Sequence, residues 1–316
     1  MPKKAGKYIL IAVGTLCVLI CAACGVFLYQ YYRGAGSEAA LTQQVRPASV
    51  TPQPPQADKA HRQEPPQQPA PEQEPEEPPQ PQPVEIPVDF AQLAEVSPDI
   101  YAWLALPDTQ VDAPVLQHPG DDLYYNAHNA HGEYYMCGAV FSQETYNDRS
   151  FDAPMTILYG HGTVLGQPGP FHELNSYAEQ DYFDTHDRMI VYTPSAMYVY
   201  RVFAAFVHGS EHLLYYYDFS DPVIFTGFFN TVREIADPQN SHFDEDGMPA
   251  PGDKVLALST CFEQDKSRRY LVMGRLEAVH PAAAGTEKNP GVPSPFLFTV
   301  GRRMGGRNAP NTPASP

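Results

Sequence analysis

Basic residues are scarce in this sequence. Its 316 residues include 20 Lys and Arg against 37 Asp and Glu, which gives a formal net charge of −17 at pH 7. Nucleic-acid binding relies on a basic face that neutralises phosphates. The charge therefore argues against a nucleic-acid partner, and it is compatible with a protein that works outside a cell membrane.

Cysteine is scarce as well. The chain has five cysteines, and three of them, Cys17, Cys21 and Cys24, lie in an apolar segment near the N-terminus. Only Cys137 and Cys261 remain for a globular part, and their spacing matches neither a disulfide framework nor a zinc site. One disulfide between them is an option, but a free thiol at Cys261 is favoured. No pattern in the sequence suits a metal or a nucleotide, so no cofactor is expected.

A long uncharged segment follows a basic N-terminus. Residues 1–7 carry three lysines and no acid, and residues 8–29 contain no charge. At about 1.5 Å per residue, a helix of this length spans roughly 33 Å and can cross a bilayer. The basic flank predicts that the N-terminus is cytoplasmic and that everything after residue 30 lies outside. We therefore predict a cytoplasmic tail at 1–7 and a transmembrane anchor at 8–30.

Two other interpretations of this segment are weaker. A cleaved signal peptide usually has an apolar core of about 7–15 residues, and this one is longer. A lipoprotein signal ending at Cys24 would usually have a leucine-like residue three positions earlier, where this chain has Cys21. The uncleaved anchor is favoured.

Residues 31–88 are dominated by Pro, Gln and Glu. Such a composition has too little apolar surface to offset the entropy of ordering. Proline favours extended polyproline II, at about 3.1 Å per residue. We predict a disordered, semi-rigid linker that holds a domain away from the bilayer, with a Pro-rich ligand for a binding module as the alternative. Residues 281–316 are predicted to form a disordered C-terminal tail.

The segment between them, residues 89–280, has the pattern of a mainly-β domain. Short apolar runs separated by turn residues predict strands, and few segments show helical spacing. The expected strands cover residues 111–116, 138–142, 155–159, 189–192, 197–207, 255–258 and a run that begins at Arg269. This pattern predicts a β-barrel or sandwich with helical insertions.

One helix of this domain is clearly marked. Asp221 is a typical N-cap and Pro222 suits the first helical position, while Asp237 and Pro238 end the segment. Its predicted apolar face consists of Ile224, Phe225, Phe228, Phe229, Val232 and Ile235. Residues 239–252 are expected to form a loop.

A string of His and Asn residues in 121–133 suggests a metal site at first sight. It consists of Asn126, His128, Asn129 and His131. The spacing lacks a supporting carboxylate or a helical frame. A solvated loop is therefore favoured.

Three polar side chains lie at the ends of apolar runs. His161 follows a run that ends in Tyr159 and Gly160, Cys261 follows Ser259 and Thr260, and Arg269 begins the next run. Each has an ordinary interpretation, as a loop histidine, a core cysteine and a surface charge. The polar residues before Cys261 indicate that its strand leaves the core there, and a free thiol outside a membrane is unusual unless it is used.

Together the three side chains form a chemical set. A thiolate is a nucleophile, and an imidazole can protonate a leaving amine. A fixed guanidinium can stabilise the oxyanion of a tetrahedral intermediate. The reaction class that uses all three is acyl transfer.

At these residues the sequence resembles the sortase family. Tyr159-Gly160-His161 resembles its histidine motif, Leu258-Ser259-Thr260-Cys261 its cysteine motif, and Arg269 its arginine. The resemblance covers about residues 89–279. The helix expected after Asp221, between two late strands, is similar to class B sortases.

This resemblance implies a closed β-barrel and a cysteine transpeptidase at the cell surface of a Gram-positive bacterium. Its expected partners are secreted proteins with a C-terminal sorting motif and an amine of peptidoglycan or of a pilin subunit. It implies that Cys261 is the nucleophile, that His161 exchanges protons and that Arg269 stabilises the oxyanion. Ser259 is a candidate substrate contact, and Arg268 is the alternative to Arg269.

The chain departs from the family pattern at two places. Ala257 stands where sortases usually have threonine, and Phe262 follows the cysteine where class B members often have an acid, with Glu263 next.

Three other functions compete with this interpretation. An L,D-transpeptidase usually has its arginine two residues after the cysteine, where this chain has Glu263. A papain-like peptidase places its cysteine before its histidine. A non-catalytic, membrane-tethered binding module would bury Cys261.

Overall fold

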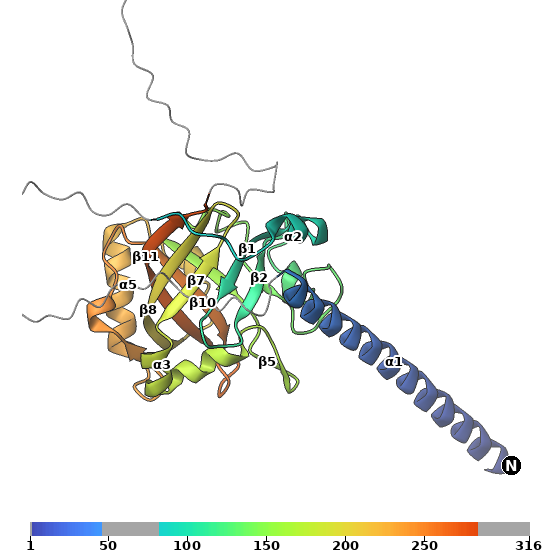
Figure 1. The fold of residues 1–316 in the computed structure, drawn as a ribbon. Coiled ribbons are helices and arrows are strands. Elements are labelled where there is room, and N and C mark those ends of the chain that lie inside the picture. The colour runs from blue at the N-terminus through green and yellow to red at the C-terminus, as the bar shows by residue number, and fades with distance from the viewer. Residues whose placement is uncertain (1, 46–81, 284–316) are drawn as a thin grey trace, which may run out of the picture.

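The computed structural model describes residues 2–45 and 82–283 (Figure 1). Most of the predicted Pro-rich linker, residues 46–81, lies outside the described residues. So does most of the predicted C-terminal tail, residues 284–316.

The domain is a closed β-barrel, as predicted. Eight strands follow one another in the order β11-β10-β4-β3-β2-β1-β7-β8, and pairing between β11 and β8 closes the ring. These strands are β1 Ile100–Ala105, β2 Asp112–Leu116, β3 Val140–Phe141, β4 Met155–Tyr159, β7 Arg188–Tyr192, β8 Ala196–His208, β10 Val255–Cys261 and β11 Arg269–Pro281. A two-residue strand, β9 His242–Phe243, adds to the edge of β8.

Short helices and a hairpin connect the strands. They are α2 Phe90–Val96, η1 Tyr124–Asn126, the hairpin β5 Thr163–Val164 with β6 Gln167–Pro168, η2 His172–Ala178, α3 Gln180–Thr185, α4 Leu213–Tyr216 and η3 Glu245–Gly247. The expected loop at 239–252 is therefore wrong in part, because it contains β9 and η3. This segment pairs with β8, which local composition does not predict.

The first part of β10, Val255 to Leu258, is apolar because both of its faces are covered. Leu256 and Leu258 pack inside the barrel. Val255 and Ala257 face the opposite side, where they join a cluster beneath α5 Pro222–Ile235. The departure at Ala257 thus lies under a helix and away from the barrel interior.

Helix α5 begins as predicted. The side chain of Asp221 accepts hydrogen bonds from the backbone N–H groups of Val223 and Ile224, and Pro222 opens the first turn. Phe225, Phe228, Phe229 and Val232 are buried on the barrel. The predicted face is too wide, because Ile224 is 37% and Ile235 71% exposed at its margins.

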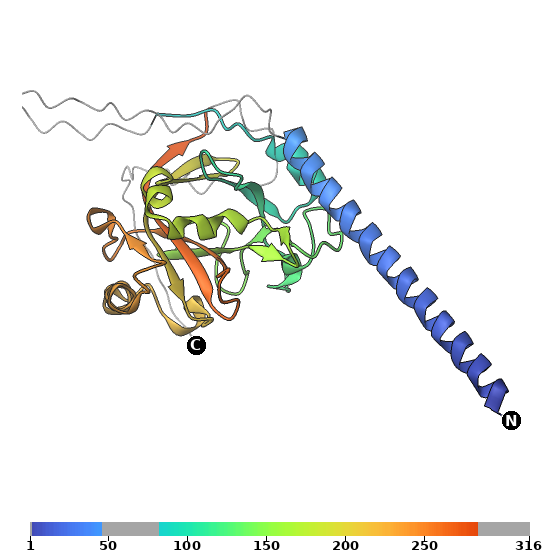
Figure 2. The ribbon, with the colours of Figure 1, turned by 90° about the horizontal axis from the view of Figure 1, so that it is seen from below.

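The N-terminal helix is longer than predicted. α1 Pro2–Val45 continues past residue 30 without a break. Side chains 12–30 are exposed, and this part is long and apolar enough to fit a membrane anchor. Residues 31–45, which composition assigned to the linker, instead lie against the barrel (Figures 1 and 2). Leu41 and Val45 are buried there, and a linker prediction fails because burial depends on a surface that local composition does not contain.

The other end of the predicted linker also belongs to the domain. Ile86 and Val88 are buried, and Val84 pairs with Ala282 in a β-bridge. Residues 84–88 and 281–283 therefore pack with the domain that was predicted at 89–280.

Candidate active site

Strand register brings the predicted site residues to one end of the barrel. β4 and β10 run parallel, with Ser259 beside Tyr159, so both strands end at the same edge. β10 and β11 are antiparallel, and Cys261 pairs with Arg269. Because parallel strands end together and a hairpin returns to the same edge, residues from distant parts of the chain meet here.

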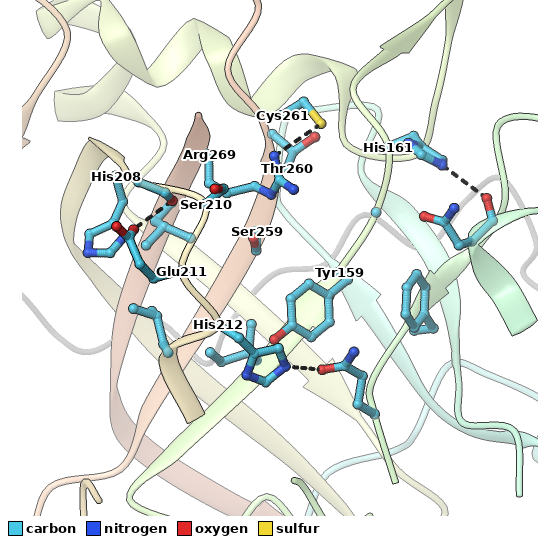
Figure 3. Close-up of a pocket in the computed structure, with 18 of the residues that line it drawn as sticks. Tyr159, His161, His208, Ser210, Glu211, His212, Ser259, Thr260, Cys261 and Arg269 are labelled. Carbon is cyan, nitrogen blue, oxygen red and sulfur yellow. Dashed lines mark hydrogen bonds and ion pairs between the residues drawn. The ribbon is translucent and has the colours of Figure 1, made fainter. Parts of the chain in front are cut away.

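The thiol and the guanidinium are in contact. Arg269 Nη1 lies 3.8 Å from Cys261 Sγ and 3.4 Å from the carbonyl oxygen of Arg268 (Figure 3). Arg269 lines the cavity at this end of the barrel, and Arg268 does not. The Arg268 carbonyl accepts a hydrogen bond from Phe262 N and so closes the turn between the strands.

Cys261 is a half-buried free thiol at the end of its strand. The prediction that the strand leaves the core before it is wrong. Ser259 is 6% and Thr260 2% exposed; Ser259 is paired on both sides, with β4 and β11, and Thr260 is still paired with Tyr270 of β11. Ser259 lines the cavity. Cys137 is buried and also free, so the two cysteines do not form a disulfide.

His161 lies on the loop after β4, across the mouth of the cavity from Cys261. Its Nε2 donates to the carbonyl oxygen of Asn126 at 2.9 Å, and the ring is directed toward that carbonyl and not toward the thiol (Figure 3). A carbonyl oxygen can only accept a hydrogen bond, so Nε2 of His161 carries the proton. Nδ1 is then the ring nitrogen that can take up and release a proton. A Cβ at Gly160 would lie 2.8 Å from the Phe171 ring, so glycine allows this loop to pack closely.

A bracket of hydrogen bonds joins the histidine loop to the cysteine loop. Glu263 Oε1 accepts from Thr163 N at 3.0 Å and pairs with Lys266 at 2.9 Å. Asn175 Nδ2 donates to the carbonyl oxygen of Cys261 at 3.2 Å, and Asn175 Oδ1 accepts from Glu263 N at 2.9 Å. We call Thr163, Asn175 and Glu263 the bracket.

The charge of Glu263 follows from its surroundings. Partial burial by itself would raise the pKa of this carboxyl, but hydrogen bonds from Lys266 and Thr163 hold the pKa below its ordinary value. Glu263 is therefore an ionised carboxylate at neutral pH. Glu263 stands one position after the place where class B sortases often have an acid. Here it connects the loop of Cys261 to the loop of His161.

A cavity of about 280 Å³ opens beside Cys261. Apolar side chains of Phe141, Ile157 and Leu271 contribute to its walls, and the segment between β8 and α4 forms a polar rim. This rim consists of His208, Gly209, Ser210, Glu211 and His212 (Figure 3). An apolar wall with a few polar groups is typical of a site for a small ligand or a peptide segment.

The rim residues have defined partners. His212 Nε2 lies 2.6 Å from Gln143 Oε1, and burial lowers the pKa of His212, so its ring is neutral at pH 7. Glu211 lies 3.8 Å from His208 Nδ1. Sequence reasoning missed this rim and Asn175, because no local motif marks them, and it considered Asn126 only as part of the His and Asn string; barrel closure brings Asn175 to Cys261 and Asn126 to His161.

The His and Asn segment is only in part the solvated loop that we predicted, since Asn126 and His131 are exposed but Asn129 is not. Asn129 is fully buried and donates to the backbone of Gly34 at 3.1 Å and to Ser37 Oγ at 2.8 Å. The ring of His128 stacks on Tyr124 at 4.1 Å. The segment is packed because α1 covers it. Within residues 2–45 and 82–283, no group of three or more His, Cys, Asp or Glu residues could hold a metal ion.

Comparison with known proteins agrees with this geometry. The sortase-domain family model matches residues 104–277. The chain is 26% identical to sortase B of Listeria monocytogenes over 194 residues, which cover 61% of this chain and 75% of that protein. It is 24% identical to sortase B of Staphylococcus aureus over 189 residues, which cover 59% and 74%.

Solved structures show the same likeness. Sortase B of Bacillus anthracis in complex with AAEK2 has a TM-score of 0.51 and 27% identity, and the match covers 63% of this chain and 88% of that one. The S. aureus sortase B–substrate complex shares the fold, with a TM-score of 0.51, 23% identity and coverage of 60% and 84%. The family match favours a sortase over the L,D-transpeptidase alternative. The chain belongs to the sortase family of transpeptidases, and within that family it is similar to class B.

Proposed function

We propose that the protein is a membrane-anchored cysteine transpeptidase with Cys261, His161 and Arg269 as its catalytic residues. It cleaves a C-terminal sorting motif of secreted proteins and transfers them to an amine of peptidoglycan or of a pilin subunit. The observation that carries this proposal is the contact between the Arg269 guanidinium and the Cys261 thiol at the mouth of a cavity.

In the first half-reaction, the Cys261 thiol gives its proton to Nδ1 of His161, and the resulting thiolate attacks the carbonyl carbon of the scissile peptide bond. An S–C bond forms, and the carbonyl oxygen becomes an oxyanion that Arg269 stabilises. When the intermediate collapses, the C–N bond breaks and His161 gives a proton to the leaving amine. The product is a thioester on Cys261.

In the second half-reaction, the acceptor amine attacks the thioester carbon. His161 takes a proton from the attacking nitrogen, and Arg269 again faces the oxyanion. The S–C bond breaks, an amide forms and Cys261 leaves as a thiolate. Because Asn126 holds Nε2–H, the free Nδ1 of His161 is the nitrogen that suits both proton transfers.

In this proposal, the substrate binds in the cavity beside Cys261. Ser259 is a substrate contact in the wall, and the polar rim with Glu211 faces it. The apolar wall receives an apolar side chain of the sorting motif.

The N-terminal helix suits the same task. Its exposed apolar part spans the membrane, and the lysines before it keep the N-terminus in the cytoplasm. The barrel then lies outside, where secreted proteins and wall amines are available.

The test uses the full chain in detergent and a library of sorting-motif peptides. Cys261→Ala should abolish cleavage, whereas Cys137→Ala, which removes the other free cysteine of the barrel, should retain it. Mass spectrometry should find an acyl adduct on Cys261 that hydroxylamine releases. If Cys261→Ala cleaves as fast as the unchanged chain, the proposal is wrong. A Cys261 that does not react with a methanethiosulfonate would favour the non-catalytic binding module.

A further inference from the structure

The segment 31–45 of α1, called the arm from here on, is fixed to one loop of the barrel. This loop covers residues 124–139. Arg33 Nη2 pairs with Glu133 Oε1 at 2.8 Å, and Ser37 Oγ donates to Glu133 Oε2 at 2.8 Å. Asn129 Nδ2 donates to both Gly34 O and Ser37 Oγ. The first half of the arm therefore has polar partners on the 124–139 loop.

Close packing accompanies these bonds. Glu38 Oε2 accepts from Ala130 N at 3.2 Å. A Cβ at Gly34 would lie 3.1 Å from the carbonyl oxygen of Tyr134 and 3.1 Å from Tyr135 Cβ, so glycine at residue 34 favours this close approach of the helix to the loop. Two positions along, a Cβ at Gly36 would meet nothing within 4 Å.

The opposite side of the same loop reaches the active site. The acceptor for His161 Nε2 is the carbonyl oxygen of Asn126, at the end of η1. The bonds Tyr135 N to Ala127 O, at 2.9 Å, and Ala139 N to Tyr125 O, at 2.9 Å, tie the two limbs of the loop together. The limb that the arm contacts is therefore joined directly to the limb that holds Asn126.

A second contact leads to the histidine from another direction. Tyr31 Oη donates to Gln167 Oε1 at 2.8 Å. Gln167 lies in the β5–β6 hairpin, which directly follows His161 in the chain. The arm thus touches both the loop that binds the imidazole and the hairpin next to it.

We infer that the arm is a positioning element for His161. By fixing the 124–139 loop, it holds the Asn126 carbonyl where that oxygen keeps Nε2 protonated and Nδ1 free. The membrane helix and the barrel then form one body, and the anchor contributes to the geometry of the active site as well as to its location. The catalytic consequence rests on the proposed function of His161, whereas the tautomer of His161 does not.

The test compares Gly34→Leu with Gly36→Leu in the full chain in detergent micelles. The two variants make the same substitution two residues apart on one helix, and only the first clashes with the loop. Imidazole nitrogen NMR with ¹⁵N-labelled histidine should show the Nε2–H tautomer for His161 in the unchanged chain and in Gly36→Leu. In Gly34→Leu it should show a mixture of tautomers. Hydrogen exchange should be faster in residues 124–139 and unchanged in β8 and β11.

Kinetics provide the second readout. With a cleaved peptide, Gly34→Leu should lower kcat about tenfold and leave KM within about twofold, because a misplaced proton donor affects the chemical step. Gly36→Leu should change neither constant. Glu133→Gln weakens the pairing with Arg33 without a clash. It should produce the same mixture of tautomers and the same fall in kcat as Gly34→Leu, but to a smaller extent. This variant keeps the inference testable if Gly34→Leu does not fold.

The inference is overturned if His161 has the same tautomer in Gly34→Leu as in Gly36→Leu while exchange shows that the loop is released. It is also overturned if releasing the loop leaves kcat unchanged. A chain without Cys261-dependent cleavage would refute the proposed function, and the tautomer comparison would still decide the role of the arm.

Discussion

The bracket between the His161 loop and the Cys261 loop gives the sharpest prediction. Asn175 bonds to the carbonyl oxygen of Cys261 and to the N–H of Glu263, and it comes from η2, far from both in sequence. Asn175→Ala removes both bonds without changing any of the three proposed catalytic residues. The loop after Cys261 then loses its bonds to η2 and keeps those to Thr163.

The magnitude follows from the number of bonds. Each hydrogen bond contributes about 0.5–1.5 kcal/mol, so Asn175→Ala should lower the free energy of unfolding by about 1–3 kcal/mol. Water can reach Glu263 and partly replace its lost bond, which favours the lower half of that range. A shift of the Cys261 backbone also moves the nucleophile relative to Arg269, and we expect kcat to fall about tenfold or more.

The assay compares Asn175→Ala with two other single variants, Glu263→Gln and Glu263→Ala. Glu263→Gln keeps an oxygen that can accept from Thr163 N and loses only the half-exposed ion pair with Lys266, which is worth at most about 1 kcal/mol. Glu263→Ala removes the acceptor. The unchanged chain and Glu263→Gln should have similar free energies of unfolding in urea and similar kcat for peptide cleavage. Both values should be lower in Glu263→Ala and Asn175→Ala. Equal kcat for Asn175→Ala and the unchanged chain would refute the positioning argument, even if stability falls.

Other predictions concern the arginine, the arm and α5. Arg269→Lys should lower kcat by about 10²-fold, since a point charge cannot replace a fixed guanidinium, whereas Arg268→Lys should stay within about twofold; an inverted order would exchange their roles. Burial raises the pKa of Glu38 from 4.5 to about 7, so its contribution to arm docking should be fully present below about pH 4.5 and lost as the pH rises through about 7. Tyr135, which faces Glu38, stays neutral over this range because burial raises its pKa. Hydrogen exchange in the 124–139 loop, corrected for intrinsic rates, should therefore increase from pH 5 to pH 8 in the unchanged chain and not in Glu38→Gln; a similar increase in both would exclude Glu38 as the cause. Asp221→Ala removes the N-cap of α5 and should lower the free energy of unfolding by about 1 kcal/mol, with little change in KM; a loss near zero in urea unfolding would show that packing alone sets the start of this helix.

The elements that were predicted correctly are those whose signal is local. β10 follows from an apolar run between Lys254 and the polar loop after Cys261, and α5 from the Asp221 cap. In both, a few adjacent residues carry enough propensity and patterning to decide the structure. The sortase likeness rests on equally short motifs around His161, Cys261 and Arg269, which is why it was visible before the fold.

Tertiary structure alone decided how these residues are held. Asn175 reaches Cys261, Asn126 reaches His161, and Ser259 stays buried, because barrel closure between β8 and β11 brings together segments that no periodicity links. The arm is the clearest case. Its composition continues into a Pro-rich linker, yet Leu41 and its neighbours are helical and buried, since the barrel offers an apolar surface that offsets the entropy of ordering them. The sequence determined the candidate reactive side chains and the strands that carry them, whereas long-range packing determined their geometry and the burial of the arm against the barrel.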